Sequence, residues 1–333
     1  MAVLNTPAGS AHARILGVGS YRPSRVIPNS DLVEAIESSD EWIRTRSGIT
    51  ERRWANDEET VAMMSVAAAR TAIERAGLVP SDIDGVLVAT VSHMKQTPAI
   101  ATQIADELGT DKPAAFDISA ACAGFCYGIG LASDMVRGGS ARHVLVIGVE
   151  RLSDITDIND RGSAFIFADG AGAVVVGPSE TPGIGPVAWG SSGDQADLIT
   201  MTDDWLSWAD SDIELTPRLT MQGNKVFRWA GFAMAEVAHE ALELAGIKPE
   251  DLDIFVPHQA NMRITDALAK SMKLPEHVKI ARDIATMGNT SAASVPLALD
   301  RMLDEGQAKS GDLALFIAFG AGLVYAAQVV VVP

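Results

Sequence analysis

The chain is poor in cysteine, in aromatic residues and in positive charge. Among its 333 residues there are 2 cysteines and 5% aromatic residues. Two cysteines cannot form a disulfide framework, and without paired histidines or cysteines nearby they do not make a zinc site, so no metal is expected. They fit a reduced, cytoplasmic setting. The formal net charge of −17 argues against nucleic acid as a partner.

Long apolar runs are also missing. No stretch approaches the length of about 20 apolar residues that a membrane-spanning helix needs. Residues 1–13 lack the basic start and apolar core of a signal peptide. We therefore expect no membrane partner. The chain does contain 47% hydrophobic residues and 29 glycines, enough for one large domain or two packed halves with tightly packed small side chains.

Apolar strand patterns alternate with amphipathic helix patterns along the chain. Strands are predicted over residues 13–18, 85–91, 114–118, 143–149, 171–176, 252–256, 313–318 and 323–332. Helices are predicted over residues 29–38, 39–46, 59–76, 98–108, from Cys122 to about residue 137, and over 223–245, 261–272 and 291–303. This alternation is typical of the α/β class.

The order of the predicted elements suggests two similar α/β halves. We assign residues 1–178 to the first and residues 179–333 to the second. In each half a short strand leads into a helix through a turn with a reactive residue, Cys122 in the first and His258 in the second. No repeat is visible at the level of single residues.

Cys122 lies in the sequence Ser-Ala-Ala-Cys-Ala-Gly-Phe, between a predicted strand and a predicted helix. The N-terminus of a helix stabilises negative charge, so this position favours a nucleophilic thiolate. A small core residue is the alternative, since free cysteine is often buried. The local sequence leaves both open. Cys126, four residues later, is expected to pack in the core.

Three further segments carry polar or glycine-rich turns at the ends of predicted strands or the starts of predicted helices: 256–261 (Val-Pro-His-Gln-Ala-Asn), 288–294 (Gly-Asn-Thr-Ser-Ala-Ala-Ser) and 319–322 (Phe-Gly-Ala-Gly). Loops at such places gather functional groups in α/β sheets. Taken alone, His258 fits a structural role, Asn289 fits a helix cap, and the 319–322 turn fits a tight strand connection. The Gly-x-Gly sequences at residues 17–19 and 170–172 do not continue as dinucleotide-binding motifs.

Residues 191–219 form a long acidic segment that contains two tryptophans. Long segments of this kind in compact domains are often lids or binding loops. We favour a loop that covers a substrate entrance, with a solvated insertion as the alternative.

Together these motifs resemble the β-ketoacyl-acyl-carrier-protein synthase III family, the initiating condensing enzymes of type II fatty acid synthesis. The similarity covers residues 13–332. Besides the segments around Cys122, 257–261, 288–291 and 319–322, it includes 39–43 (Ser-Asp-Glu-Trp-Ile) with 46–49, and 160–162 (Asp-Arg-Gly) with 167–172. The resemblance implies the thiolase fold: two similar halves stacked as five α-β-α-β-α layers, in a homodimer.

The resemblance also implies a reaction and the residues that perform it. Cys122 would take the acyl group of a primer acyl-CoA and then pass it to the carbanion formed by decarboxylation of malonyl-acyl-carrier protein. His258 and Asn289 would stabilise the enolate, and the backbone N–H groups of Cys122 and Ala321 would form the oxyanion hole. No cofactor is implied beyond the coenzyme A thioester substrate. Asn289 and the lack of a late cysteine distinguish this pattern from elongating condensing enzymes and from thiolases.

By the same resemblance, Trp42 and Arg161 would enclose the adenine of coenzyme A, and Arg46 would contact its phosphates. Asn224 would contact the pantetheine arm, with Phe227 beside it. Stacking of a guanidinium and an indole on a flat base is physically suited to this task.

Three basic residues, Arg228, Arg263 and Lys270, are candidates for docking the acidic carrier protein, with a solvated helix face as the alternative. Thr97 lies where family members often carry a bulky aromatic in the acyl pocket. Its smaller side chain leads us to expect branched or longer primers, such as isobutyryl-CoA, besides acetyl-CoA.

Phe125 and Phe319 are expected to pack in the core rather than to shield the thiol. An acyltransferase or starter-unit synthase of a specialised, polyketide-type pathway is the alternative function. A non-catalytic partner that only binds carrier protein would be expected to lose its nucleophile, and Cys122 is present.

Overall fold

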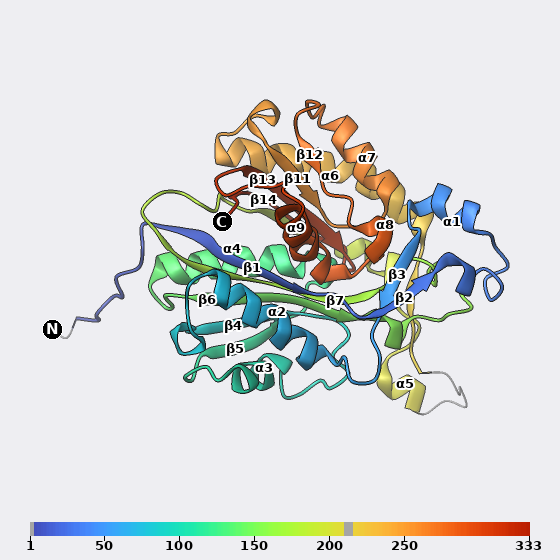
Figure 1. Cartoon of the computed structure of the whole chain (residues 1–333), viewed down its shortest axis with the longest axis horizontal. Helices are drawn as coiled ribbons and strands as arrows, with labels where there is room; N and C mark the ends of the chain where they lie inside the picture. Colours follow the sequence, from blue (N-terminus) through green and yellow to red (C-terminus); the bar gives the residue numbers. More distant parts are fainter. Residues whose placement is uncertain (1–2, 210–215) are drawn as a thin grey trace.

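The computed structural model describes residues 3–209 and 216–333 (Figure 1). Its strands are β1 (His12–Tyr21), β2 (Arg25–Pro28), β3 (Glu51–Trp54), β4 (Gly85–Ala89), β5 (Ala114–Ile118), β6 (Val144–Arg151), β7 (Asp169–Ser179), β8 (Ala188–Ser191), β9 (Ile199–Met201), β10 (Leu219–Met221), β11 (Ile254–Pro257), β12 (Lys279–Ile280), β13 (Leu313–Gly320) and β14 (Val324–Val331).

The α-helices are α1 (Asp40–Ser47), α2 (Val61–Arg75), α3 (Ile100–Leu108), α4 (Gly124–Gly138), α5 (Trp205–Ala209), α6 (Gly223–Ala245), α7 (Met262–Ser271), α8 (Ile284–Met287) and α9 (Ser294–Asp304). Short 3₁₀ turns include η1 (Asn29–Asp31), η3 (Ala121–Ala123), η5 (Gly193–Leu198) and η7 (Ser291–Ala293).

Two five-stranded sheets with the same topology form the centre of the molecule. The first has the order β1-β7-β6-β4-β5 and the second the order β8-β14-β13-β11-β12. In each, three neighbouring strands run parallel, the next strand is antiparallel to them, and the fifth is antiparallel to that strand. This confirms the predicted α/β class with two similar halves. The boundary between residues 178 and 179 stays a prediction; it falls at the end of β7.

Each sheet is buried on both faces, which explains the continuous apolar strands. Successive side chains of a strand point to opposite faces. Thus Val146 and Phe316 face a middle core that contains α4 and α9, whereas Ile147 and Ile317 face outer cores. Helices α2 and α3 cover the first sheet from outside, and α6 and α7 cover the second (Figure 1). The result is the expected α-β-α-β-α stack.

The two central helices start in the same way. A 3₁₀ turn precedes each helix, η3 before α4 and η7 before α9. The first residue of each turn has a positive φ, 44° at Ala121 and 48° at Ser291. Each turn packs against a glycine of the opposite sheet: a Cβ atom at Gly320 would lie 2.6 Å from the nitrogen of Cys122, and one at Gly148 would lie 2.2 Å from the carbonyl oxygen of Ala292. Both contacts therefore require glycine.

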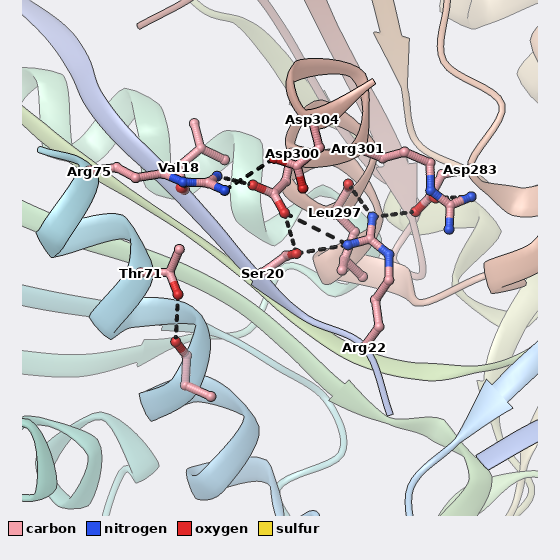
Figure 2. A network of polar contacts seen from close by, with 11 residues as sticks. Val18, Ser20, Arg22, Thr71, Arg75, Asp283, Leu297, Asp300, Arg301 and Asp304 are labelled. Carbon is pink, nitrogen blue, oxygen red and sulfur yellow. Dashed lines mark hydrogen bonds and ion pairs between the residues drawn. The ribbon is translucent and has the colours of Figure 1, made fainter. Parts of the chain in front are cut away.

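Arginine and aspartate side chains from both halves meet beside α9 (Figure 2). Asp283 pairs with Arg301 at 2.8 Å and with Arg22 at 3.5 Å, and Arg75 of α2 pairs with Asp300. Both aspartates are buried, and a buried carboxylate that lacked these partners would be strongly destabilising. The network joins the end of β1 and helix α2 to the helices of the second half.

Several boundaries differ from the predictions. The helix predicted over residues 29–38 is only the short turn η1, and Glu37 has a positive φ of 47°, which a regular helix does not allow. The helix predicted over 39–46 is α1, and Ser39 caps it by accepting from the N–H of Trp42 at 3.1 Å. The paired strands β2 and β3 were not predicted.

The segment 191–219 is not simply a loop. It contains the turn η5, the strand β9 and the helix α5, and β9 pairs with β10, which begins at the last residue of the segment. Residues 210–215 of this segment, with its Asp210 and Asp212, lie outside the described residues.

Candidate active site

A cavity of about 640 Å³ lies between the two halves and brings the three predicted catalytic residues together. Cys122 comes from the turn η3, His258 directly follows β11, and Asn289 follows α8. All three side chains line the cavity. Residues more than 160 positions apart in the sequence therefore share one site, as the resemblance implied.

Cys122 is partly exposed to the cavity, but burial raises the pKa of its thiol to about 12. The nearby Glu150 carboxyl raises the pKa further, and the Ser291 hydroxyl lowers it. Burial thus opposes the acidity that the start of a helix would give this thiol, because desolvation disfavours the charged sulfur. Activation of the sulfur requires a group that takes its proton.

His258 is buried, and burial lowers the pKa of its imidazole to about 3, so the ring is neutral. Its Nδ1 lies 2.7 Å from the hydroxyl of Ser294, which also accepts from the N–H of Gln259. When the Ser294 hydroxyl donates to Nδ1, Nε2 carries the hydrogen and can donate to a ligand. The ring of Phe319 packs edge-on against the imidazole at 5.6 Å.

Asn289 has its amide orientation set by the turn that follows it. Its Oδ1 accepts from the N–H of Ser291 at 2.8 Å, which leaves the NH₂ group as the donor. Its backbone is held by bridging hydrogen bonds to Ile166 and Ala168. The side chain therefore binds the first N–H of η7 and also lines the cavity.

The proposed oxyanion groups also meet at the cavity. Cys122 and Ala321 both line it, and Gly320 brings the end of β13 against the backbone of Cys122. Positive φ angles among the described non-glycine residues fall elsewhere, so alanine is accommodated at position 321.

The exposed end of the cavity contains the residues predicted for coenzyme A. The guanidinium groups of Arg161 and Arg46 lie 5.1 and 5.3 Å from the ring centre of Trp42. Asn224 and Phe227 of α6 line the same cavity.

Of the other predicted site residues, some line the cavity and some lie outside it. Arg263 lines the cavity with its guanidinium 4.9 Å from the ring of Phe227, whereas Arg228 and Lys270 are exposed and lie outside the lining. Thr97 is exposed in the single chain and does not reach the cavity. Phe125 and Cys126 are fully buried in the middle core, as predicted.

Some lining residues were not predicted. An apolar wall comes from segments that carry no motif: Leu152, Ile155, Phe165, Ile166, Ile199, Met201, Leu219 and Met221. Three of the wall residues belong to the 191–219 segment and Met221 flanks it, which supports a role at the substrate entrance. Ser291 and Ser294 lie inside a recognised motif, but nothing in their spacing assigns them a task.

Among the described residues, no helix has both the length and the apolar character to cross a membrane. In the same part of the chain, no cluster of three or more His, Cys, Asp or Glu side chains could hold a metal ion.

Two stacked sheets of equal topology, with a cysteine, a histidine and an asparagine meeting between them, define a thiolase-fold condensing enzyme. Models described as 3-oxoacyl-[acyl-carrier-protein (ACP)] synthase III and as its C-terminal part match residues 116–193 and 242–332. The chain belongs to the β-ketoacyl-[acyl-carrier-protein] synthase III family.

Full-length relatives support this assignment. The beta-ketoacyl-[acyl-carrier-protein] synthase III of Streptomyces glaucescens is 60% identical, with 100% of both chains covered. The crystal structure of the priming beta-ketosynthase from the R1128 polyketide biosynthetic pathway has a TM-score of 0.97 at 48% identity and covers 100% of this chain and 99% of that one. The synthase III of Aquifex aeolicus has a TM-score of 0.89 at 39% identity and covers 96% of this chain and 100% of that one.

Proposed function

We propose that this protein transfers the acyl group of a primer acyl-CoA to Cys122 and condenses it with malonyl-acyl-carrier protein, giving β-ketoacyl-acyl-carrier protein, coenzyme A and CO₂. The observation that supports this most is the single cavity that runs from Trp42 and Arg161 to Cys122, His258 and Asn289. Its exposed end suits a nucleotide, and its buried end suits thioester chemistry. The reaction needs no further cofactor.

In the first half-reaction, Cys122 attacks the thioester carbonyl, and the N–H groups of Cys122 and Ala321 receive the oxyanion. Covalent capture divides one difficult transfer into two easier steps. In the second, loss of CO₂ leaves an enolate oxygen, to which neutral His258 donates through Nε2 and Asn289 through its NH₂ group. Each preorganised donor contributes about 3 kcal/mol to such a step. The carbanion then attacks the acyl-Cys122 thioester.

Recognition of coenzyme A would exploit the two arginines that flank Trp42. An adenine ring inserted between Trp42 and Arg161 would replace their direct contact with stacking on both faces. Arg46 would remain available for a phosphate. Asn224 and Phe227 would then border the pantetheine arm.

The acidic carrier protein would dock on the basic residues of α6 and α7. Arg263 reaches the cavity, and Arg228 and Lys270 are exposed on the same two helices. Such a local patch is needed because the whole molecule is strongly acidic.

A homodimer would form through the edge strand β5. Phe116 of β5 is 40% exposed, and Val91 and Met94 in the loop between β4 and α3 are also exposed. Thr97 belongs to the same loop. We propose that a second copy covers this apolar edge and brings Thr97 to the acyl pocket, where its small side chain admits branched primers. We place the protein in the cytoplasm.

The test is incubation with radiolabelled acetyl-CoA or isobutyryl-CoA and malonyl-acyl-carrier protein. We expect labelled β-ketoacyl-carrier protein with both primers, and mass spectrometry should locate the acyl group on Cys122. Absence of product with any primer, while the protein is folded, would contradict the function. Use of acetyl-CoA alone would contradict only the primer assignment.

The second candidate is a starter-unit synthase of a polyketide pathway. The 48% identical priming ketosynthase with a TM-score of 0.97 favours it specifically. Competition between a fatty acid and a polyketide carrier protein for the same labelled acyl-enzyme distinguishes the two, since the physiological carrier should react faster.

A further inference from the structure

Glu150, near the end of β6, is a fully buried carboxyl group close to the active-site cysteine. One of its oxygens, Oε2, accepts three hydrogen bonds: from the Ser92 hydroxyl at 2.6 Å, the Val91 N–H at 3.0 Å and the Thr90 hydroxyl at 3.2 Å. The other oxygen, Oε1, is buried and has no hydrogen-bond partner. A buried carboxyl oxygen without a partner is costly, so its position requires an explanation.

The Glu150 side chain, which carries this unpaired Oε1, faces the active-site turns. Gly148 packs directly against Ala292 of η7, and residues two apart on a strand point to the same face. Glu150 therefore points toward the side of β6 on which η7 lies. The turn η7 in turn contacts η3, which carries Cys122.

Ser291, the first residue of η7, interacts with both titratable groups. Its side chain lines the cavity with Cys122, and its hydroxyl lowers the pKa of both the Cys122 thiol and the Glu150 carboxyl. A hydroxyl can accept a proton on one side while it donates its own on the other. The Ser291 hydroxyl is therefore able to relay a proton between the other two side chains.

We propose that Glu150 accepts the proton of the Cys122 thiol through the Ser291 hydroxyl and holds it while the acyl group is bound. This inference deepens the proposed function by supplying the base that the first half-reaction lacks. As Sγ attacks the thioester carbonyl, its proton passes to Ser291 Oγ and the Ser291 proton passes to Glu150 Oε1. Coenzyme A leaves as a thiolate and takes a proton from solvent.

The same path closes the cycle. When the carbanion attacks the acyl-Cys122 thioester and the intermediate collapses, the C–S bond breaks and Sγ keeps the electron pair. The proton on Glu150 then returns through Ser291 to Sγ. The enzyme regains its starting state, and one proton is taken from solvent per turnover. His258 and Asn289 remain free to act as donors to the enolate.

The surroundings of Glu150 suit a base that works near neutral pH. Burial raises the pKa of its carboxyl to about 7, against the lowering effect of the hydroxyls of Ser92, Ser291 and Thr90 and of the Val91 N–H. A base is most effective when its pKa lies near the working pH. The other candidate, His258, uses Nδ1 for Ser294 and is a weak base, since burial lowers its pKa to about 3.

Two titratable groups on neighbouring elements bear on this assignment. From η3, Cys122 interacts with the charge of Glu150. On β7, Asp169 is buried too, but it lies opposite Arg151 and so on the other face of the sheet. Burial raises the pKa of Asp169 to about 6, and its hydrogen bonds go to Ser153 and Ala55. Asp169 is therefore a matched buried carboxyl that has no path to the thiol.

The test measures alkylation of Cys122 by iodoacetamide between pH 5 and pH 10 in the full chain, with mass spectrometry to separate Cys122 from the buried Cys126. The natural protein should show a rise in rate around neutral pH as Glu150 loses its proton. Glu150→Gln should remove this rise and slow alkylation at pH 7.5 at least about tenfold. Asp169→Asn should keep the natural pH profile.

Ser291→Ala is the second variant, since it breaks the path but leaves the carboxyl. Alanine tolerates this backbone conformation, because Ala121 adopts nearly the same φ at the matching turn. It should lose the same neutral rise as Glu150→Gln. Folding of each variant is checked by circular dichroism, and if Glu150→Gln does not fold, Ser291→Ala alone decides the question.

Opposite results would overturn the proposal. If Glu150 only repels the thiolate, Glu150→Gln will alkylate faster than the natural protein at pH 7.5. If Glu150 only anchors the loop of Thr90 and Ser92, its removal will lower the melting temperature and leave the pH profile unchanged. Because alkylation uses neither acyl-CoA nor carrier protein, its outcome is independent of whether the proposed substrates are correct.

Discussion

The turns that start the two central helices share a backbone conformation but carry different side chains. The turns η3 and η7 begin with the same positive φ and each packs against a glycine of the opposite sheet. In the first, Ala121 precedes Cys122; in the second, Ser291 precedes Ala292. The first turn therefore presents a sulfur where the second presents a methyl group. The comparison shows that the duplicated scaffold places the turns, and single side chains decide what each turn does.

The largest expected effect comes from making the first turn like the second. Cys122→Ala gives η3 the residue that η7 has, and the acyl group then has no nucleophile to bind. Transfer from acyl-CoA should fall more than about 10³-fold, measured as release of coenzyme A. The control is Cys126→Ala, which removes the core thiol one helical turn later. Loss of acyl transfer in the control alone would contradict the assignment of Cys122.

The next largest effect is expected from removal of the Asn289 side-chain amide, whose orientation is set by the N–H of Ser291 in η7. Asn289→Ala should slow decarboxylation of malonyl-acyl-carrier protein by about 10²–10³-fold, since one of two enolate donors is gone. Formation of the acyl-enzyme should change much less. Rapid-quench measurement of the two half-reactions checks this. An equal loss in both would mean that Asn289 supports the turn rather than the enolate.

The arginine and aspartate network beside α9 (Figure 2) contributes to stability, and this contribution can be measured apart from catalysis. Asp283→Asn removes the buried carboxylate that pairs with Arg22 and Arg301 and should lower the free energy of unfolding by about 3 kcal/mol. Chemical denaturation provides the measurement. Arg44→Ala, which breaks the exposed pair with Asp40, should cost less than about 1 kcal/mol. Similar losses in both would show that burial of Asp283 is unimportant.

The pH dependence of stability follows from the raised pKa of Glu150. Burial raises this pKa from 4.5 to about 7, so between these values the folded protein binds a proton that the unfolded chain has lost. The group's contribution to stability is complete below pH 4.5 and is lost as the pH rises through 7, by up to about 3 kcal/mol. Glu150→Gln should remove this decline. Parallel stability curves for both proteins from pH 4.5 to 8 would exclude the raised pKa.

The smallest effect is expected at the start of α9. Ser294→Ala removes the partner of His258 Nδ1 and should slow decarboxylation about tenfold, because the imidazole loses its preferred tautomer. Ser65 of α2 is an equally buried helix serine far from the cavity, and Ser65→Ala is the control. A larger loss in the control than in Ser294→Ala would contradict the role of Ser294.

The sequence predicts the layered scaffold well because its signals are local. Continuous apolar runs identify the buried strands, and Ser39 marks the start of α1. The helix predicted over 29–38 is wrong, and Glu37 within it has a positive φ of 47°, a backbone conformation that local propensity does not reveal.

The features of the site also divide into those that local sequence predicts and those that depend on tertiary contacts. Cys122, His258 and Asn289 carry recognisable motifs, so their meeting in one cavity could be anticipated. The environment that sets their protonation could not, because it depends on burial. The apolar pattern ends the predicted strand at residue 149, one position before Glu150, and a single acid after a strand resembles any surface residue.

The contact between Gly320 and Cys122 has a consequence for synthesis of the protein. The residue that holds the nucleophile's backbone in place is made near the very end of translation, about 200 residues after the nucleophile itself. A nascent chain still lacking β13 has its thiol but neither the wall behind it nor Ala321 beside it. A chain that lacks β13 is therefore expected to have the thiol without the pocket that the proposed acyl transfer needs.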